Sequence, residues 1–520
     1  MAAPLARQAN PGARSWQGSG PRIGPDARVV VHSVPMADLL LLQPHTELFD
    51  SLKSAPTLPL ALLSAARLAA AEFEVELLDQ RVERDWRGAL AAAVRGGCRA
   101  VGITSVTGRQ LLHAAEAARA AKELGATVIW GGVHASLLDE QVLRDGLADV
   151  VVRGEGEQTL LELMRALARQ QPLQAVDGLS LLRDGSLQRT PDRPFADLGA
   201  LPDVPYHLAG PRYLFSRRGR PTLYLETSRG CPHGCTYCYN TAYHNRRWRG
   251  EPADSVLGRI DRALAALPGV RHLSLVDDNF FTDRKRALAI AEGLAERGRD
   301  LTFQVQGASV SDLDRLAAAE LALLARSGCA RLDMGVETGS PRILASVGKQ
   351  LDLGAVRRVN RLLREHGMVP WYNFMAGFPG ETEEDLSATI DLILELTKDN
   401  PAALVSPVYC LAPYPGTRIF DQSRASGVRF PEHTEAWAGF SLDRPHDPSV
   451  GRARAEFLSA LYFYSIFIDG KIEEYDTIPG LALAARLYRP LARWRLERRF
   501  FSLSPERRLS EWIVSRRHAR

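Results

Sequence analysis

The chain has 520 residues, of which 45% are hydrophobic, and its formal net charge is +4. Two or three domains fit this length, because a single hydrophobic core stops growing beyond about 250–300 residues. The small net charge gives no support for nucleic acid as an obligate partner, and no apolar run reaches the roughly 18–20 residues that span a bilayer. We therefore expect a soluble, cytoplasmic protein with no transmembrane segment.

Residues 1–27 are rich in Pro, Gly, Ala and Arg and lack apolar periodicity, which predicts a disordered lead-in. Strands and helices then alternate as far as residue 172. The predicted strands are 28–34, 73–78, 100–105, 127–130 and 149–152, and the predicted helices are 58–71, 86–95, 109–124, 138–145 and 156–169. This alternation indicates an α/β fold with a Rossmann-like, doubly wound parallel sheet.

Glycines and small polar residues follow three of these strands, in segments 105–108, 131–136 and 154–157. The carboxyl ends of parallel strands meet at one edge of the sheet, and ligands of such sheets bind there. A Gly-Gly pair at a strand-to-helix turn is nevertheless common in this class of fold, so the pattern alone names no ligand.

Residues 173–221 read as a linker that contains a hairpin around Arg183–Ser186. The alternation resumes over residues 222–420. The predicted strands are 223–227, 272–276, 302–306, 331–335, 369–376 and 403–409, and the predicted helices are 254–266, 284–297, 312–327, 353–366 and 384–397. Residues 421–520 are predicted to be a helical C-terminal segment. Its stretch 481–499 combines apolar residues with many Arg, which suits a helix that touches a membrane surface or an apolar substrate or, as we prefer, a solvated helix packed on its own domain.

Three of the six cysteines, Cys231, Cys235 and Cys238, are spaced C-x3-C-x2-C. Three thiolates can hold three irons of a [4Fe–4S] cluster and leave the fourth iron open, whereas a purely structural cluster normally takes four cysteines. A disulfide with a spare thiol conflicts with the low cysteine content. A zinc site would need a fourth ligand, and His233 lacks a second spaced pair. The other cysteines, Cys98, Cys329 and Cys410, are expected to be structural. Cys410 ends the last predicted strand of residues 222–420, so a catalytic role is the alternative for it.

The loop from Ser228 to Asn240 resembles the cluster loop of radical S-adenosylmethionine (SAM) enzymes. The resemblance implies that the three cysteines bind the cluster, that its open iron chelates SAM, and that an electron then cleaves SAM to a 5′-deoxyadenosyl radical. It also implies that Tyr237 packs near the adenine. The six strand–helix units would form the partial (β/α)6 barrel of that family.

Further SAM contacts are expected at the carboxyl ends of the barrel strands. Asp277 and Asp278 would accept from the α-ammonium group, Glu337 and Gln306 would bind the ribose, and Gly377 and Gly380 would lie beside the adenine. Each has a simpler interpretation. The aspartates could cap a helix with Asn279, Gln306 could be a core polar group, and 377–381 could be a turn before a helix.

The segments 130–136 and 152–157 resemble cobalamin-binding domains that are fused to radical SAM enzymes. The cobalamin contacts that the resemblance implies are Ser105, Thr107, Gly131, Gly132, His134, Gly154 and Glu155. The chain lacks the Asp-x-His-x-x-Gly loop whose His ligates cobalt in many such domains, and His45 lacks that motif's partners. Cobalt would then be bound without histidine ligation, and His134 would touch the cofactor without being its lower ligand.

Together these resemblances predict a cobalamin-dependent radical SAM C-methyltransferase that acts on a small molecule. A flavodoxin- or ferredoxin-like protein would supply the electron. Two alternatives remain open: a cyclase or rearrangement enzyme that transfers no methyl group, and a non-enzymatic cobalamin sensor. Thiomethylation of transfer RNA is disfavoured, because it calls for further cluster cysteines ahead of the barrel. The substrate is not identified.

Overall fold

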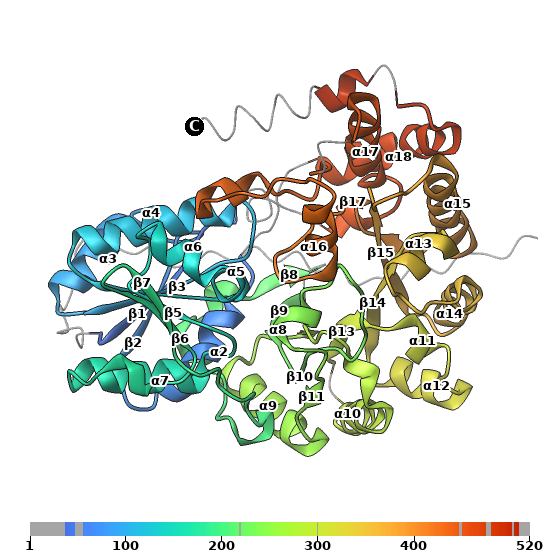
Figure 1. The fold of residues 1–520 in the computed structure, drawn as a ribbon. Helices are drawn as coiled ribbons and strands as arrows, with labels where there is room; N and C mark the ends of the chain where they lie inside the picture. Colours follow the sequence, from blue (N-terminus) through green and yellow to red (C-terminus); the bar gives the residue numbers. More distant parts are fainter. Residues whose placement is uncertain are drawn as a thin grey trace, which may run out of the picture. The chain divides into compact units, whose positions relative to one another are not determined.

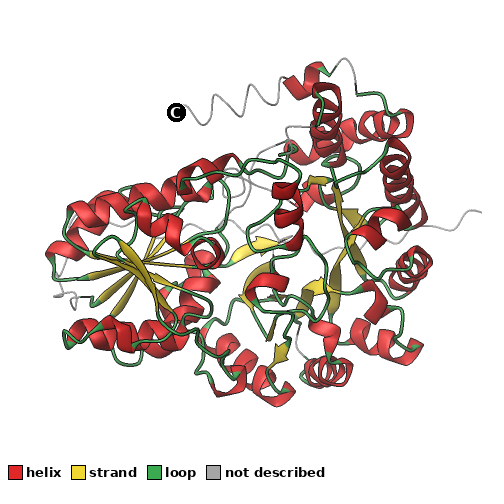
Figure 2. Ribbon diagram, viewed as in Figure 1, coloured by secondary structure: helices red, strands yellow, loops and turns green. Residues whose placement is uncertain are grey.

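The computed structural model describes residues 37–46, 56–217, 220–298, 300–446, 450–474, 480–501 and 504–508. They all belong to one compact unit, residues 36–520. Along this unit the chain builds a first sheet with its helices, then a second sheet with its helices, and then a helical C-terminal segment (Figures 1 and 2).

The first sheet has the strand order β2-β1-β3-β4-β5-β6-β7. Its strands are β1 (Leu39–Gln43), β2 (Val75–Asp79), β3 (Ala100–Thr104), β4 (Thr127–Gly131), β5 (Val150–Val152), β6 (Leu179–Arg183) and β7 (Ser186–Arg189). The strands β1 to β5 are parallel, which confirms the predicted doubly wound sheet. The predicted hairpin in the linker is β6–β7, and it extends this sheet with antiparallel strands.

The first strand of this sheet was not among the predicted strands. The predicted lead-in, 1–27, and the predicted strand 28–34 lie outside the described residues, and β1 occupies 39–43. Four consecutive leucines of β1 are buried because helices cover both faces of the sheet. Leu39 and Leu41 pack with the helices α2 and α7, whereas Leu40 and Leu42 pack with α3 and α4.

The helices of this domain lie on both faces of the sheet (Figure 1). They are α2 (Leu60–Ala69), α3 (Trp86–Arg95), α4 (Gln110–Glu123), α5 (Val133–Leu137), α6 (Asp139–Arg144) and α7 (Glu157–Ala168). Short 3-10 helices follow at Leu173–Ala175, Leu198–Ala200, Tyr206–Leu208 and Pro211–Tyr213.

The second sheet is open, with the strand order β16-β15-β14-β13-β12-β9-β8, and β17 pairs with β15. Its strands are β8 (Phe215–Arg217), β9 (Arg220–Leu225), β12 (His272–Leu275), β13 (Thr302–Ala308), β14 (Cys329–Glu337), β15 (Val369–Ala376), β16 (Leu404–Val405) and β17 (Tyr409–Cys410). A separate two-stranded ribbon, β10 (Ser228–Arg229) with β11 (Arg249–Gly250), flanks the cysteine loop. Parallel strands from β9 to β16 confirm the six predicted units.

The helices that accompany this sheet are α8 (Asn240–Tyr243), α9 (Ala253–Ala266), α10 (Arg284–Glu296), α11 (Val310–Leu313), α12 (Ala318–Arg326), α13 (Pro341–Ser346), α14 (Leu353–Glu365) and α15 (Glu383–Asp399), with a 3-10 turn at Phe280–Thr282. Two predicted elements are divided. The helix 312–327 is interrupted because Glu320 accepts from the backbone N–H of Ala317 and starts α12 there. The strand 403–409 is split at Pro407, which has no backbone N–H.

The C-terminal segment contains α16 (Arg418–Ala425), α17 (Arg452–Ser465) and α18 (Leu481–Arg498), with 3-10 helices at Thr434–Gly439 and Lys471–Glu474. Part of this segment returns to the first domain, where Trp437 Nε1 donates to Gln141 Oε1 (2.8 Å) and the backbone N–H of Thr434 donates to Asp145 (2.7 Å). No described helix has both the length and the apolar character needed to cross a membrane.

Candidate active site

The three closely spaced cysteines lie on the loop between β10 and α8, and each is half-buried. Burial raises the pKa of Cys231, and it raises that of Cys238 to about 12, with a contribution from the neighbouring thiols. In the described part of the chain, no three His, Cys, Asp or Glu side chains lie close enough to hold a single metal ion. In a four-iron cluster, each thiolate instead binds a different iron.

Two adjacent aspartates after β12 hold this loop at both ends. Asp277 accepts from the backbone N–H and hydroxyl of Thr227 (both 2.5 Å) and from the N–H of Ser228 (2.9 Å). Asp278 accepts from the N–H of Gly230 (2.7 Å), from the hydroxyl of Tyr239 (2.8 Å) and from Asn240 Nδ2 (2.8 Å). The helix-capping alternative does not hold, because Asp283 caps α10.

Gly230 lets the chain pass close to the turn that closes the loop. Its φ is +83°, and a Cβ at this position would lie 2.0 Å from the carbonyl oxygen of Arg247. Only glycine fits both constraints, since a side chain disfavours this φ and has no space here.

Tyr237 belongs to a second polar group. Lys349 Nζ lies 3.0 Å from Glu337 Oε1 and 3.5 Å from the Tyr237 hydroxyl. Burial alone would lower the pKa of Lys349, but the Glu337 carboxylate and nearby thiols raise it. Glu337 has φ +72° at a register shift in β14, which turns its side chain toward this lysine. Glu337, which was expected to bind the ribose, is therefore already ion-paired with Lys349.

The remaining residues expected to bind SAM lie at the ends of β13 and β15. Gln306 is exposed and its amide donates to Ser274 Oγ (2.8 Å), so it is not a buried core residue. Gly377 and Gly380 have φ values of +80° and +67° in a tight turn. The Gly377 N–H donates to Glu381 (2.8 Å), whose carboxylate also pairs with Arg454 of α17 (3.2 Å). Burial raises the pKa of Glu381 to about 7.

A cavity of about 370 Å³ lies where the carboxyl edge of the first sheet meets the cysteine loop. One wall contains Gly131, Gly132 and Glu155 of the first domain, and the other contains Arg229, Tyr239, Tyr243 and Asp278 of the second. Leucine, isoleucine and valine make up half of the remaining lining residues. An apolar cavity with a few converging polar groups is typical of a cofactor or ligand site.

The glycine pair at the end of β4, Gly131 and Gly132, forms part of the first-domain wall. Gly132 has φ +89°, and a Cβ there would lie 2.7 Å from Thr104 Oγ1. Across the cavity, the Tyr243 hydroxyl donates to the carbonyl oxygen of Gly154 (2.7 Å). Gly131, Gly132 and Glu155 thus meet the cavity, and Gly154 borders it through Tyr243.

Three other residues expected to contact cobalamin are not on the cavity wall. Ser105 accepts from Trp130 Nε1 (2.9 Å), and Thr107 is hydrogen-bonded to His134 Nδ1 (2.9 Å). His134 is 1% exposed, lies edge-on to Trp437, and has its pKa lowered to about 4 by burial. It is therefore neutral at pH 7.

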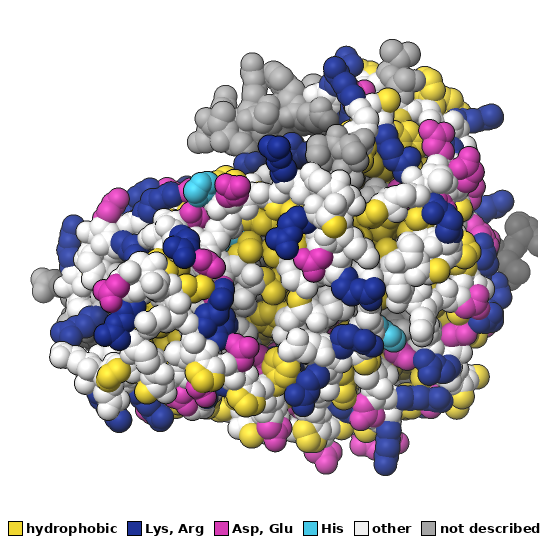
Figure 3. Space-filling view, in the orientation of Figure 1, with side chains coloured by type: hydrophobic (Ala, Val, Ile, Leu, Met, Phe, Trp, Pro, Cys, Tyr) yellow, Lys and Arg dark blue, Asp and Glu magenta, His cyan; other side chains and the backbone are white. Residues whose placement is uncertain are grey.

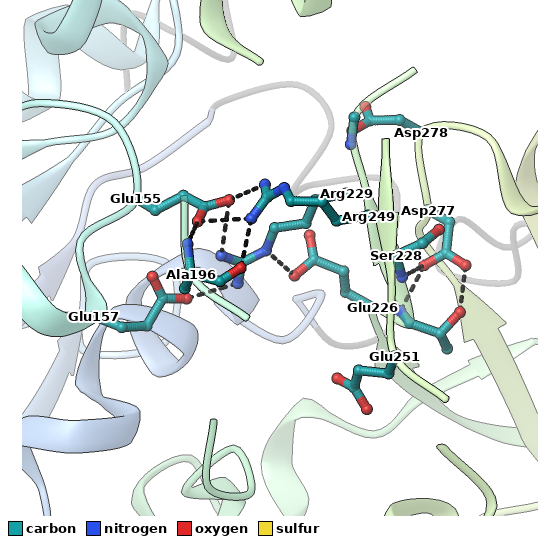
Figure 4. Close-up of polar contacts among 12 residues, drawn as sticks. Glu155, Glu157, Ala196, Glu226, Ser228, Arg229, Arg249, Glu251, Asp277 and Asp278 are labelled. Carbon is teal, nitrogen blue, oxygen red and sulfur yellow. Dashed lines mark hydrogen bonds and ion pairs between the residues drawn. The ribbon is translucent and has the colours of Figure 1, made fainter. Parts of the chain in front are cut away.

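Arg229, directly before Gly230, joins the two walls of the cavity (Figure 4). Its guanidinium pairs with Glu157 (2.6 Å) and Glu155 (3.4 Å) of the first domain and with Glu226 (2.6 Å) at the end of β9. Burial alone would lower the pKa of Arg229, but these carboxylates raise it well above its usual range. Arg249 forms another ion pair with Glu155 and donates to the carbonyl oxygen of Ala196 (2.9 Å).

The sequence did not identify several of these residues, because their partners lie far away in the chain. Arg229 and Glu157 are 72 residues apart, and Lys349 and Tyr237 are 112 apart. Their only signal was their position in the sequence: Arg229 lies in the segment that leads into the cysteines, and Glu157 is the last residue of the segment 152–157 that resembles cobalamin-binding domains. Among the remaining cysteines, Cys98, Cys329 and Cys410 are all buried in hydrophobic cores, so none of them faces the cavity.

Family models match both domains of the chain. The model described as the radical SAM superfamily matches residues 225–393, and the model described as the B12 binding domain matches residues 53–164. The two matches contain β2 to β5 of the first sheet and β12 to β15 of the second, and between them every residue that lines the cavity except Leu41.

Named relatives cover most of the chain. An uncharacterized methyltransferase of Pyrococcus horikoshii is 29% identical over 76% of this chain and 84% of its own length. Bacteriochlorophyllide d C-12(1)-methyltransferase of Chlorobaculum tepidum is 29% identical over 74% and 78%. The anaerobic magnesium-protoporphyrin IX monomethyl ester cyclase of Rubrivivax gelatinosus is 26% identical over 58% and 54%.

Two solved structures share the fold. The cobalamin-dependent SAM radical enzyme OxsB, with aqua-cobalamin bound, superposes with a TM-score of 0.71 at 18% identity, over 92% of this chain and 75% of its own. The radical SAM methyltransferase TsrM from Kitasatospora setae, with cobalamin and a [4Fe–4S] cluster bound, has a TM-score of 0.62 at 22% identity, over 76% of each chain. The predicted fold class is confirmed. The chain is an enzyme that carries a B12-binding domain ahead of a radical SAM domain, and these two domains imply cobalamin, SAM and a [4Fe–4S] cluster as its cofactors.

Proposed function

We propose that the enzyme methylates a carbon atom of a small molecule. When bound, the cluster and SAM supply the 5′-deoxyadenosyl radical, and cobalamin supplies the methyl group. The names of the relatives favour this reaction, since two of the three described above are methyltransferases. A low-potential flavodoxin- or ferredoxin-like protein is the proposed electron donor.

One observation carries the proposal: a single cavity is lined both by the carboxyl edge of the B12-binding sheet and by residues beside the cysteine loop. A cofactor on the first wall and a substrate beside the loop would share one space with largely apolar walls. Exclusion of water protects a radical from quenching by side reactions.

The chain's own residues have positioning roles in this proposal. Cys231, Cys235 and Cys238 would hold the cluster, and Asp277 and Asp278 fix the loop that carries them. Gly131 and Gly132 would let a large planar cofactor approach the backbone. Tyr237, Gln306, Glu337, Gly377 and Gly380 remain proposed contacts to SAM. Because Lys349 already pairs with Glu337, that carboxylate would bind the ribose through its remaining acceptor sites.

Anaerobic reconstitution with iron, sulfide, cobalamin and isotope-labelled SAM tests the proposal. We expect 5′-deoxyadenosine to form, and a product heavier than its substrate by one CH₂ unit for each methyl group transferred. The variant Cys231→Ala should lose 5′-deoxyadenosine but keep the cobalamin absorption spectrum. The matched control Cys98→Ala should keep both, because Cys98 is buried in the first domain. Formation of 5′-deoxyadenosine by Cys231→Ala would contradict the proposal.

A second candidate function is cyclisation or rearrangement without methyl transfer. The similarity to the Rubrivivax gelatinosus cyclase favours it. In that reaction 5′-deoxyadenosine forms, but the product never gains labelled methyl carbon. A cobalamin sensor would bind cobalamin and form no 5′-deoxyadenosine at all.

A further inference from the structure

Helix α18 presents an apolar stripe to the solvent. Leu483, Leu487, Leu491 and Trp494 are 62%, 73%, 42% and 43% exposed, and their spacing places them on one side of the helix. The opposite side, with Ala485, Ala492 and Leu496, is buried against the protein. A surface helix of a globular protein normally has polar residues on its outer side, so α18 is apolar on both sides.

Positive charge is concentrated in the part of the sequence that contains α18. Residues 481–520 contain eleven Arg and three Glu, a net charge of +8, so the other 480 residues together carry −4. Arg486 is exposed beside the stripe, and Arg498 is exposed in line with it at the C-terminal end of α18. Figure 3 shows hydrophobic side chains beside Lys and Arg on the part of the surface where α17 and α18 lie.

We propose that the outer side of α18 binds the surface of a membrane that contains anionic lipids. Exposed Leu and Trp with flanking Arg form the pattern of a helix that lies in the membrane interface, where the apolar side chains enter the acyl boundary and arginines meet lipid phosphates. A second copy of the chain is disfavoured as the occupant, because two such surfaces would bring like charges together. The surface does not depend on which reaction the enzyme catalyses.

Co-sedimentation of the full-length protein with lipid vesicles tests this proposal. Vesicles of phosphatidylcholine with phosphatidylglycerol should pellet the protein, and added salt should weaken this binding, whereas phosphatidylcholine alone should pellet much less. The double variant Leu487→Glu/Trp494→Glu should bind the anionic vesicles about tenfold more weakly or worse. The double variant Arg486→Glu/Arg498→Glu should also bind the anionic vesicles about tenfold more weakly.

Matched controls place a charge elsewhere on the surface. Leu112→Glu, at an exposed leucine on α4, and Arg361→Glu, at an exposed arginine on α14, should bind vesicles like the wild type. All variants should keep the wild-type unfolding midpoint and the same yield of 5′-deoxyadenosine, since the changed residues lie away from the cavity. The proposal is overturned by wild-type protein that ignores anionic vesicles, by α18 variants that bind like the wild type, or by a stripe that mediates only self-association in sedimentation velocity.

Discussion

Single residues around the cysteine loop divide into those that would bind cofactors and those that hold the loop. Asp277 belongs to the second group, because three donors from Thr227 and Ser228 use its two oxygens. Its position at the end of β12 led to the expectation of a contact to SAM. The structure adds a role that a sequence alone does not reveal, since the donors lie 49 and 50 residues earlier.

The variant Asp277→Asn should loosen the cysteine loop. An amide offers one acceptor oxygen, and its NH₂ group would face an N–H or hydroxyl donor, so at least one buried donor loses its partner. We expect a loss of about 1–3 kcal/mol in the free energy of unfolding and lower iron content after reconstitution. Chemical denaturation and iron analysis measure these. Asp283→Asn, which alters the cap of α10 away from the loop, should keep full iron content, and full iron in Asp277→Asn would contradict the assigned role.

Glu381 should make the stability of the cofactor-free protein depend on pH. Burial raises its pKa from 4.5 to about 7 in the folded protein. Between these values the folded state keeps a proton that the unfolded state releases, so the free energy of unfolding falls as pH rises from about 4.5 to 7, by up to about 3 kcal/mol. Glu381→Gln removes this fall. The unfolding midpoints of the wild type and of Glu381→Gln, measured between pH 4.5 and 7, should therefore diverge. If the two midpoints change with pH in parallel, the raised pKa of Glu381 is excluded.

Motifs made of neighbouring residues could be found in the sequence, whereas pairs made by folding could not. The three cysteines and the glycine pair 131–132 are contiguous patterns, so their spacing alone indicated a site. Lys349 and Arg229 gained significance only from the carboxylates that the fold brings to them. His134 lay in a recognisable segment, but its burial against Trp437 depends on a C-terminal segment 303 residues later.

At the scale of elements, alternating apolar segments predicted most strands and helices within a few residues. The strand 369–376 and the helix 86–95 have the predicted bounds. The strand β1 was missed because Leu39–Leu42 contains only leucines, which favour helix more than the β-branched residues typical of strands. The two-stranded ribbon β10–β11 was also missed, since each of its strands has two residues.

Gly230→Ala should disrupt the start of the cysteine loop. Its Cβ would overlap the Arg247 carbonyl, which belongs to the turn before β11. The control is Gly185→Ala. Gly185 has a similar left-handed backbone, with φ +74°, but it lies in a hairpin where an added Cβ would have no atom within 4 Å beyond its chain neighbours. The control should lose only the roughly 1–2 kcal/mol of a left-handed alanine. Gly230→Ala should lose more of the free energy of unfolding and bind less iron, which chemical denaturation and iron analysis measure. Equal losses of stability in the two variants would mean that the turn at Arg247 moves to make room for the added Cβ.

At the scale of the whole molecule, the two domains are joined by charges and by a returning segment. Residues 433–440 leave the second domain and pack on α4 and α6 of the first, where Trp437 and Phe440 enter its hydrophobic core. The sequence placed these residues in a C-terminal segment and assigned them no partner. Pairing between domains is set by surface complementarity, which no periodic pattern within one segment encodes.

Arg229 is the central charge of the domain junction, and its loss should affect both domains. Arg229→Ala leaves Glu155, Glu157 and Glu226 close together, which should lower the free energy of unfolding by about 3–5 kcal/mol. Arg229→Lys should recover only part of this loss, because an ammonium cannot bridge three carboxylates as a planar guanidinium does. The control Arg262→Ala breaks an exposed ion pair with Asp203 and should change stability little. Because Arg229 contacts both walls of the cavity, its variants should also bind cobalamin more weakly, as absorption titration can measure. An unchanged affinity for cobalamin would show that the positions of the two walls do not depend on Arg229.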